Sequence, residues 1–130
     1  MSRVGGRETK LEILVRKYLH LKGFRFRKND KRYPGTPDLV LPKYNTIIFV
    51  HGCFWHGHKN CRLSRRPNTN KTYWNKKIDE NIKRDNQNIK ELRKIKWCII
   101  IIWECQIKSA SSREKYLAKL SKRIYECKLK

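Results

Sequence analysis

The segment from Gly52 to Thr72 constrains the fold more than any other part of the sequence. It has no apolar periodicity and is rich in Cys, His, Arg, Asn and Gly, although apolar runs lie on both sides of it. An irregular loop of this length is uncommon inside a compact domain unless something organises it. We therefore expect a bound metal ion to organise the segment and to contribute to the folding energy.

Cysteine and histidine side chains with the spacing of metal ligands cluster in this segment. Cys53, His58 and Cys61 lie close together, and Cys105 follows a predicted strand that is rich in isoleucine. A set of three cysteines and one histidine favours a closed, structural, tetrahedral zinc site over a magnesium site. The alternative is that Cys105 is only a small buried apolar residue and that the other three form an incidental cluster.

The two remaining cysteines are expected in the core. Cys98 lies on the apolar strand and Cys127 on the apolar face of the last predicted helix. An odd number of cysteines argues against a disulfide framework, as does the reducing compartment that we expect. The sequence shows no signal-peptide core and no apolar run long enough to span a membrane, so we expect a cytoplasmic protein that does not act at a membrane.

Apolar periodicity predicts an α/β fold in one domain spanning residues 1–130. Helical spacing predicts three helices, at about residues 9–21, 78–92 and 111–124. Thr9-x-x-Glu12 and Ser111-x-x-Glu114 have the form of capping boxes at the starts of the first and last. Alternating or continuous apolar runs predict strands near 24–26, 38–41, 46–51 and 97–103. This order indicates a mixed sheet flanked by helices.

The charge of the chain points to a polyanionic partner. Thirty-three Lys and Arg residues against eleven Asp and Glu give a net charge of +22. Nucleic acid is the natural partner, although charge alone does not separate a DNA enzyme from a ribosomal or membrane-surface protein. The aromatic content argues against disorder. Cations around the second helix are expected to contact phosphates without reading bases: Lys71, Lys76, Lys77, Lys83 and Arg84. The alternative for any single one of them is a solvated surface position.

One acidic residue and two histidines have the chemistry that phosphodiester hydrolysis requires. Asp38 follows a rigid Pro- and Gly-rich turn and is a candidate ligand for a hard divalent cation beside a phosphate. The alternative is that Asp38 starts a strand and accepts a hydrogen bond from a turn amide. His51 and His56 lie at or just beyond a predicted strand end, where a neutral imidazole can act as a general base. Either histidine is also chemically able to bind the zinc ion in place of His58.

Three motifs together resemble the very-short-patch repair (Vsr) endonuclease family, and the resemblance runs from about Met1 to Lys108. The motifs are Pro34-Gly35-Thr36-Pro37-Asp38, Phe49-Val50-His51-Gly52-Cys53-Phe54-Trp55-His56-Gly57-His58 and Trp103-Glu104-Cys105. The family is similar in fold to restriction endonucleases. The resemblance therefore implies a restriction-endonuclease-like sheet and magnesium-dependent nicking of duplex DNA beside the thymine of a T:G mismatch, the product of 5-methylcytosine deamination.

The resemblance also implies a role for each matching residue of the reaction centre. Asp38 and the backbone carbonyl of Val50 would ligate magnesium, His56 would be the general base, and His51 would assist at the phosphate. Glu12 would reach the metal through water, although the capping-box spacing explains this residue without catalysis.

The resemblance further implies a zinc site and a DNA wedge. Zinc would be held by Cys53, His58, Cys61 and Cys105. Phe54, Trp55 and Trp74 match aromatic side chains that enter the base stack, with Met1 as a minor wedge. Such insertion costs least where base pairing is weak, which favours a mismatch. Trp74 has the alternative role of packing at the start of a helix.

The sequence leaves two other functions open, a zinc-stabilised DNA-binding module without catalysis and a nuclease that cuts a specific unmismatched site. Family members carry a basic segment ahead of the position that matches Met1, so we expect changed DNA affinity, sequence context or mismatch selectivity here, with nicking retained. We expect a monomeric bacterial enzyme that acts on the DNA of the nucleoid.

Overall fold

A computed structural model describes the backbone of residues 6–129 and the side chains of residues 10–128. Met1, the predicted minor wedge, lies outside the described residues. Within the described part of the chain, no helix is both long enough and apolar enough to cross a lipid bilayer.

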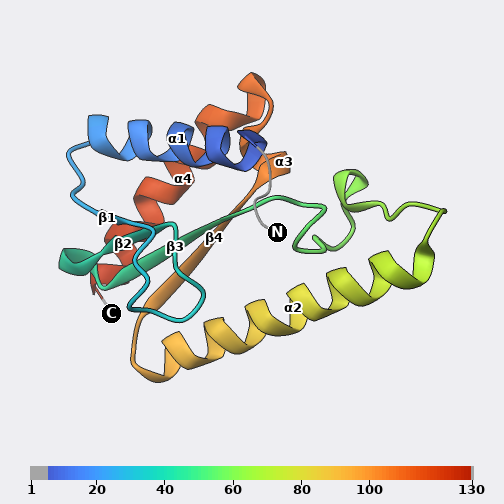
Figure 1. The fold of residues 1–130 in the computed structure, drawn as a ribbon. Helices are drawn as coiled ribbons and strands as arrows, with labels where there is room; N and C mark the ends of the chain where they lie inside the picture. Colours follow the sequence, from blue (N-terminus) through green and yellow to red (C-terminus); the bar gives the residue numbers. More distant parts are fainter. Residues whose placement is uncertain (1–5, 130) are drawn as a thin grey trace.

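Four strands form one mixed sheet in the order β1-β2-β3-β4 (Figure 1). They are β1 (Arg27–Lys28), β2 (Leu39–Leu41), β3 (Thr46–His51) and β4 (Cys98–Trp103). Strands β1, β2 and β3 pair in antiparallel fashion, and β3 pairs with β4 in parallel, with His51 opposite Trp103. The prediction of a mixed sheet with flanking helices is confirmed.

Helices cover both faces of this sheet. The long helices are α1 (Gly6–Leu21), α2 (Lys71–Lys94) and α4 (Ala110–Leu129), and the short elements are η1 (Pro42–Tyr44), η2 (Arg62–Ser64) and α3 (Glu104–Ile107). Helices α1 and α4 lie together on one side, and α2 lies on the other side (Figure 1). The predicted hairpin is present, with η1 between its two strands.

Two apolar clusters explain why β3 and β4 read as continuous apolar runs. Ile48 and Ile100 belong to the cluster under α1 and α4, whereas Ile47 and Ile99 belong to the cluster under α2. Strands in a sheet that is covered on both faces lack the alternation of polar and apolar residues. The two central strands are therefore fixed from both sides, and their carboxyl ends form a rigid support for the segments that follow.

Three element boundaries predicted from the sequence are wrong. Helix α1 begins at Gly6, so Thr9 lies inside the helix and does not cap it; Arg7 and Glu8 are good helix formers and extend it. Helix α4 begins at Ala110, and the hydroxyl of Ser109, not of Ser111, accepts a hydrogen bond from a first-turn amide, at 3.2 Å. The edge strand is residues 27–28 and not 24–26, because Phe24 is buried in the core directly after the turn that ends α1.

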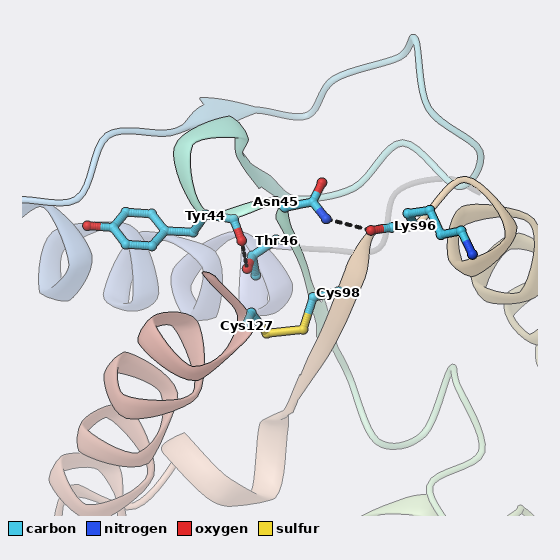
Figure 2. The surroundings of a disulfide bond; sticks show 6 residues. All are labelled: Tyr44, Asn45, Thr46, Lys96, Cys98 and Cys127. Atoms are coloured by element: carbon cyan, nitrogen blue, oxygen red, sulfur yellow. Dashed lines mark hydrogen bonds between the residues drawn. A yellow bond between two sulfur atoms is a disulfide. The ribbon is translucent and has the colours of Figure 1, made fainter. Parts of the chain in front are cut away.

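Cys98 and Cys127 form a disulfide, which corrects the prediction that the chain has none. Cys98 is the first residue of β4 and Cys127 lies in the last turns of α4, with their Cα atoms 6.0 Å apart (Figure 2). Both residues do pack against the apolar cluster, as expected. Their pairing follows from the path of α4, which returns the chain across the sheet to the end at which β4 begins.

Candidate active site and metal centre

A cavity of about 180 Å³ opens at the carboxyl end of β3. Three segments line it: the turn from Gly35 to Asp38, the end of β3 from Phe49 to His51, and the middle of α2 from Asp85 to Ile89. His56, from the irregular segment after β3, completes the wall. Segments far apart in the sequence thus bring one aspartate, two histidines and a second aspartate to the same cavity.

Asp38 is held beside Val50 by the pairing of β2 with β3. Its carboxylate oxygen Oδ2 accepts a hydrogen bond from the backbone N–H of Val50 at 2.6 Å. The turn before Asp38 has left-handed backbone at Gly35 (φ 81°), and a Cβ at Gly35 would lie 3.0 Å from the side-chain nitrogen of Asn88 in α2. The turn is therefore packed closely against α2, and it presents Asp38 to the cavity.

His51 and His56 stack face to face inside this cavity. Their ring centroids are 3.8 Å apart and their planes differ by 4°. His51 is 5% exposed, and its Nδ1 atom has no hydrogen-bond partner among the described residues. Burial, with the neighbouring His56 as the next cause, lowers the pKa of His51 to about 3. His51 is thus a neutral imidazole at pH 7.

Asp85 is the side-chain partner of His56, and it was not among the site residues predicted from the sequence. Its Oδ2 atom lies 2.7 Å from Nδ1 of His56. The signal was present, because Asp85 falls at helical spacing between Ile82 and Ile89, on the side of α2 that faces the sheet. An acid on an apolar helix face costs free energy unless it has a partner.

The four predicted zinc ligands lie together at the ends of β3 and β4. Ligand atoms of Cys53, His58, Cys61 and Cys105 all lie within 4.8 Å of one another. Nδ1 of His58 is 3.4 Å from the sulfur of Cys53 and 3.5 Å from that of Cys105. Cys53 and Cys105 meet because each follows by two residues the parallel pair formed by His51 and Trp103.

The surroundings of the four side chains suit a bound cation. Burial raises the pKa of the Cys53 thiol, so a thiolate at this position requires positive charge beside it. The carboxylate of Glu104 accepts a hydrogen bond from the Cys53 amide at 3.1 Å, and the Trp103 ring stacks on His58 at 4.0 Å. Backbone and ring orientation are therefore both set before a metal binds.

Gly57 separates the two histidines that serve different sites. His56 faces Asp85, whereas His58 faces the cysteines. Gly57 between them has φ +58°, and a Cβ there would lie 2.5 Å from Cδ1 of Ile82. Glycine is therefore required both by the backbone conformation and by the close approach of α2.

Phe54, Trp55 and Trp74 form one aromatic cluster next to these sites. Their ring centroids are 5.2 to 5.8 Å apart, with the edge of one ring toward the face of the next. The three side chains are half-buried. Asn81 of α2 donates a hydrogen bond to the carbonyl of Trp55 at 3.0 Å, which holds the cluster to the helix. Trp74 lies in the first turn of α2, so it also packs at a helix start.

Glu12 does not line the cavity that holds Asp38. Its carboxylate lies 3.7 Å from the guanidinium of Arg16, one turn further along α1. The early start of α1 also removes the capping box. Its catalytic role stays a prediction.

Comparison with known proteins agrees with these motifs. The family model "DNA mismatch endonuclease Vsr" matches residues 1–63. The type II nicking enzyme V.NmeAIP of Neisseria meningitidis serogroup A is 47% identical over 124 residues, which is 95% of this chain and 88% of that protein. The nicking enzyme V.XorIIP of Xanthomonas oryzae is 40% identical over 114 residues, 88% and 83% of the two chains. The DNA mismatch endonuclease Vsr of Escherichia coli is 38% identical over 108 residues, 83% and 69% of the two chains. With its fold, its clustered site residues and these relatives, the protein belongs to the Vsr family of DNA endonucleases.

Proposed function

We propose that this endonuclease nicks duplex DNA beside the thymine of a T:G mismatch, in a reaction that depends on magnesium. The observation that carries the proposal is the cavity in which Asp38, His51, His56 and Asp85 meet, which we call the reaction centre. A carboxylate and a paired histidine in one cavity supply a metal ligand and a general base, the two groups that hydrolysis of a phosphodiester needs.

Asp38 and the carbonyl of Val50 would hold the magnesium ion. A carboxylate and a backbone carbonyl are the hard oxygen donors that magnesium prefers, and both residues line the cavity. When bound, the ion supplies positive charge beside the scissile phosphate. The hydrogen bond from the Val50 amide to Asp38 fixes the carboxylate before any ion or DNA arrives.

His56 is suited to remove the proton from the attacking water. If Nδ1 of His56 donates its proton to Asp85, the lone pair of the ring lies on Nε2, where it can accept a proton. The carboxylate also stabilises the imidazolium that results. The side chain of His56 is 22% exposed, which leaves access for water. His51 is neutral and stacked on His56, so it can orient the base without repelling it.

Cys53, His58, Cys61 and Cys105 would bind structural zinc. With four protein ligands the site has no open position for a substrate, which separates it from the reaction centre. The zinc ion would tie the irregular segment to α3 and so hold Phe54, Trp55 and His56 in place.

The aromatic cluster supports a preference for mismatches. Insertion of Phe54, Trp55 and Trp74 into DNA unstacks base pairs at a cost of a few kcal/mol, and that cost is lowest where pairing is already weak. The cations along α2 would hold the phosphates.

We propose a restriction-endonuclease-like fold in a single domain over residues 1–130, acting as a monomer on bacterial nucleoid DNA in the cytoplasm. The order of strands and the position of the reaction centre at one end of the sheet support this fold.

A site-specific nicking enzyme is the second candidate, because several relatives bear the name of type II nicking enzymes. The two candidates share the reaction and differ in whether the mismatch is required. The function of a DNA-binding module without catalysis does not agree with membership of a family of DNA endonucleases.

The deciding experiment compares labelled duplexes that carry T:G or T:A at the same position, with magnesium or with chelator. Nicking of the T strand of the T:G duplex alone would support the proposal, and equal nicking of both would support the second candidate. Asp38→Asn should abolish nicking without loss of folding or of zinc. Asp79→Asn, the same change at an exposed position of α2, is the matched control and should remain active. An active Asp38→Asn protein would refute the assigned reaction centre.

A further inference from the structure

A second cavity lies at the other end of the sheet from the reaction centre. We name it the basic pocket; it has a volume of about 350 Å³, and its lining includes Arg25, Phe26, Arg27, Lys43 and Tyr44. Tyr44 lies two residues before Thr46, the first residue of β3, whereas the reaction centre lies at His51, the last residue of this strand. A strand from Thr46 to His51 is roughly 17 Å long. Phe26 and Tyr44 also pack on the α1 and α4 side of the sheet.

The side chains of the basic pocket have the chemistry of a phosphate site. Arg25, Arg27 and Lys43 are exposed, and they surround the half-buried rings of Phe26 and Tyr44. The two segments that form the pocket, residues 22–28 and 42–45, contain no acidic residue. Arginine binds phosphate oxygens through paired N–H groups, and lysine adds positive charge.

Aromatic side chains pack next to the basic pocket and hold Tyr44 in position. Phe24, Tyr44 and Tyr125 contact one another with ring centroids 5.2 to 5.7 Å apart. The disulfide between Cys98 and Cys127 holds the last turns of α4 in this region, next to the chain around Tyr44 (Figure 2). Lys128, the residue after this disulfide, lies over the Tyr44 ring at 5.3 Å.

We propose that the basic pocket binds the phosphate backbone of a second DNA segment while the first occupies the reaction centre. The pocket lies at the opposite end and on the opposite face of the sheet, so it shares no lining residue with the cavity that would hold the scissile phosphate. An enzyme with two such sites transfers directly from one DNA segment to another without passing through solution. The proposal concerns the search for a site, and it depends on neither magnesium nor a mismatch.

The test measures how fast the protein leaves a labelled T:A duplex, in chelator, as unlabelled competitor duplex is increased. For the native protein the dissociation rate should rise with competitor concentration, because a second duplex binds before the first leaves. For the triple variant Arg25→Gln, Arg27→Gln, Lys43→Gln the rate should not depend on competitor. The proposal would be overturned if the dissociation rate of the native protein did not depend on competitor concentration. It would also be overturned if the dissociation rate of the triple variant still rose with competitor concentration.

A second triple variant controls for loss of charge alone. Lys115→Gln, Lys119→Gln, Lys122→Gln removes three exposed cations from α4, and it should keep the competitor dependence. An equal loss in this control would refute a defined site. If the first triple variant fails to fold, Lys43→Gln in the exposed turn replaces it and should weaken the dependence.

The salt dependence gives an independent measure. A protein bound to an immobilised duplex should capture a second, fluorescent duplex. If the pocket neutralises three phosphates, capture should fall about 40-fold between about 50 and 200 mM salt. Capture that does not change with salt would argue against phosphate contacts. Capture of an acidic peptide in preference to DNA would overturn the identity of the partner.

Discussion

Replacement of Gly57 by alanine tests whether this one residue holds both candidate sites in place. Its φ of +58° costs a residue with a Cβ about 1–2 kcal/mol. The new Cβ would also lie 2.5 Å from Cδ1 and 3.0 Å from Cγ1 of Ile82, and overpacking of this kind costs about 1–3 kcal/mol. We therefore expect Gly57→Ala to lower the free energy of unfolding by about 2–5 kcal/mol.

Gly23→Ala is the matched control. Gly23 also has a positive φ, +86°, but a Cβ there would meet nothing within 4 Å. It should show only the backbone cost, about 1–2 kcal/mol. The difference between the two variants isolates the contact with α2. Adding Ile82→Val to Gly57→Ala removes the closest atom and should recover part of that difference.

Urea unfolding followed by tryptophan fluorescence measures these free energies, and zinc content and nicking are measured in parallel. Gly57→Ala should also lower both zinc binding and nicking at a temperature where the protein is still folded, because His56 and His58 flank the residue. Equal destabilisation by Gly57→Ala and Gly23→Ala would refute the close packing of this turn on α2. Normal zinc binding and nicking would refute its role in positioning the two histidines.

Three further predictions concern other contacts. Asp85→Asn should reduce kcat by about 100- to 10,000-fold with DNA affinity unchanged, since His56, the proposed base, loses the carboxylate beside its Nδ1 atom. Single-turnover nicking and DNA binding measure these two quantities. An unchanged kcat would contradict the prediction. Reduction of the disulfide, whose cysteines lie 29 residues apart in the sequence, should lower the free energy of unfolding by about 3–4 kcal/mol. Denaturation with and without reductant measures this difference. The free energy of unfolding of the Cys98→Ala, Cys127→Ala protein should not change with reductant. Cys61→Ser should weaken zinc binding and expose Phe54 and Trp55, as zinc analysis and fluorescence would show; full zinc content would contradict the ligand set.

Local features of the chain were predictable because they depend on neighbouring residues. The hairpin, the two continuous apolar strands and the long helix follow from periodicity and turn residues. The helix ends were less predictable, since Thr9 and Ser111 match a capping pattern but other residues begin the helices. A capping motif indicates only that a helix can begin at that position. The residues before the motif determine whether the helix extends further toward the N-terminus.

The choice among the histidines required the tertiary structure. By spacing, His51, His56 and His58 were equivalent candidates for the zinc site. The structure brings His58 to the cysteines and stacks His51 on His56 in the other cavity. Gly57 lies between His56 and His58 with a left-handed backbone, and the two side chains reach different partners, Asp85 and the cysteines.

The sequence by itself determined which chemistry the protein carries: the zinc-type ligands, the carboxylate of Asp38, the aromatic residues and the excess of positive charge. These are properties of side chains and of short spacings. Only the tertiary structure decided which of them meet. Asp85 reaches His56 across 29 residues, Cys105 reaches His58 across 47, and Cys127 reaches Cys98 through the return of α4. Such contacts depend on strand register and helix packing, which the whole apolar core sets and no local pattern encodes.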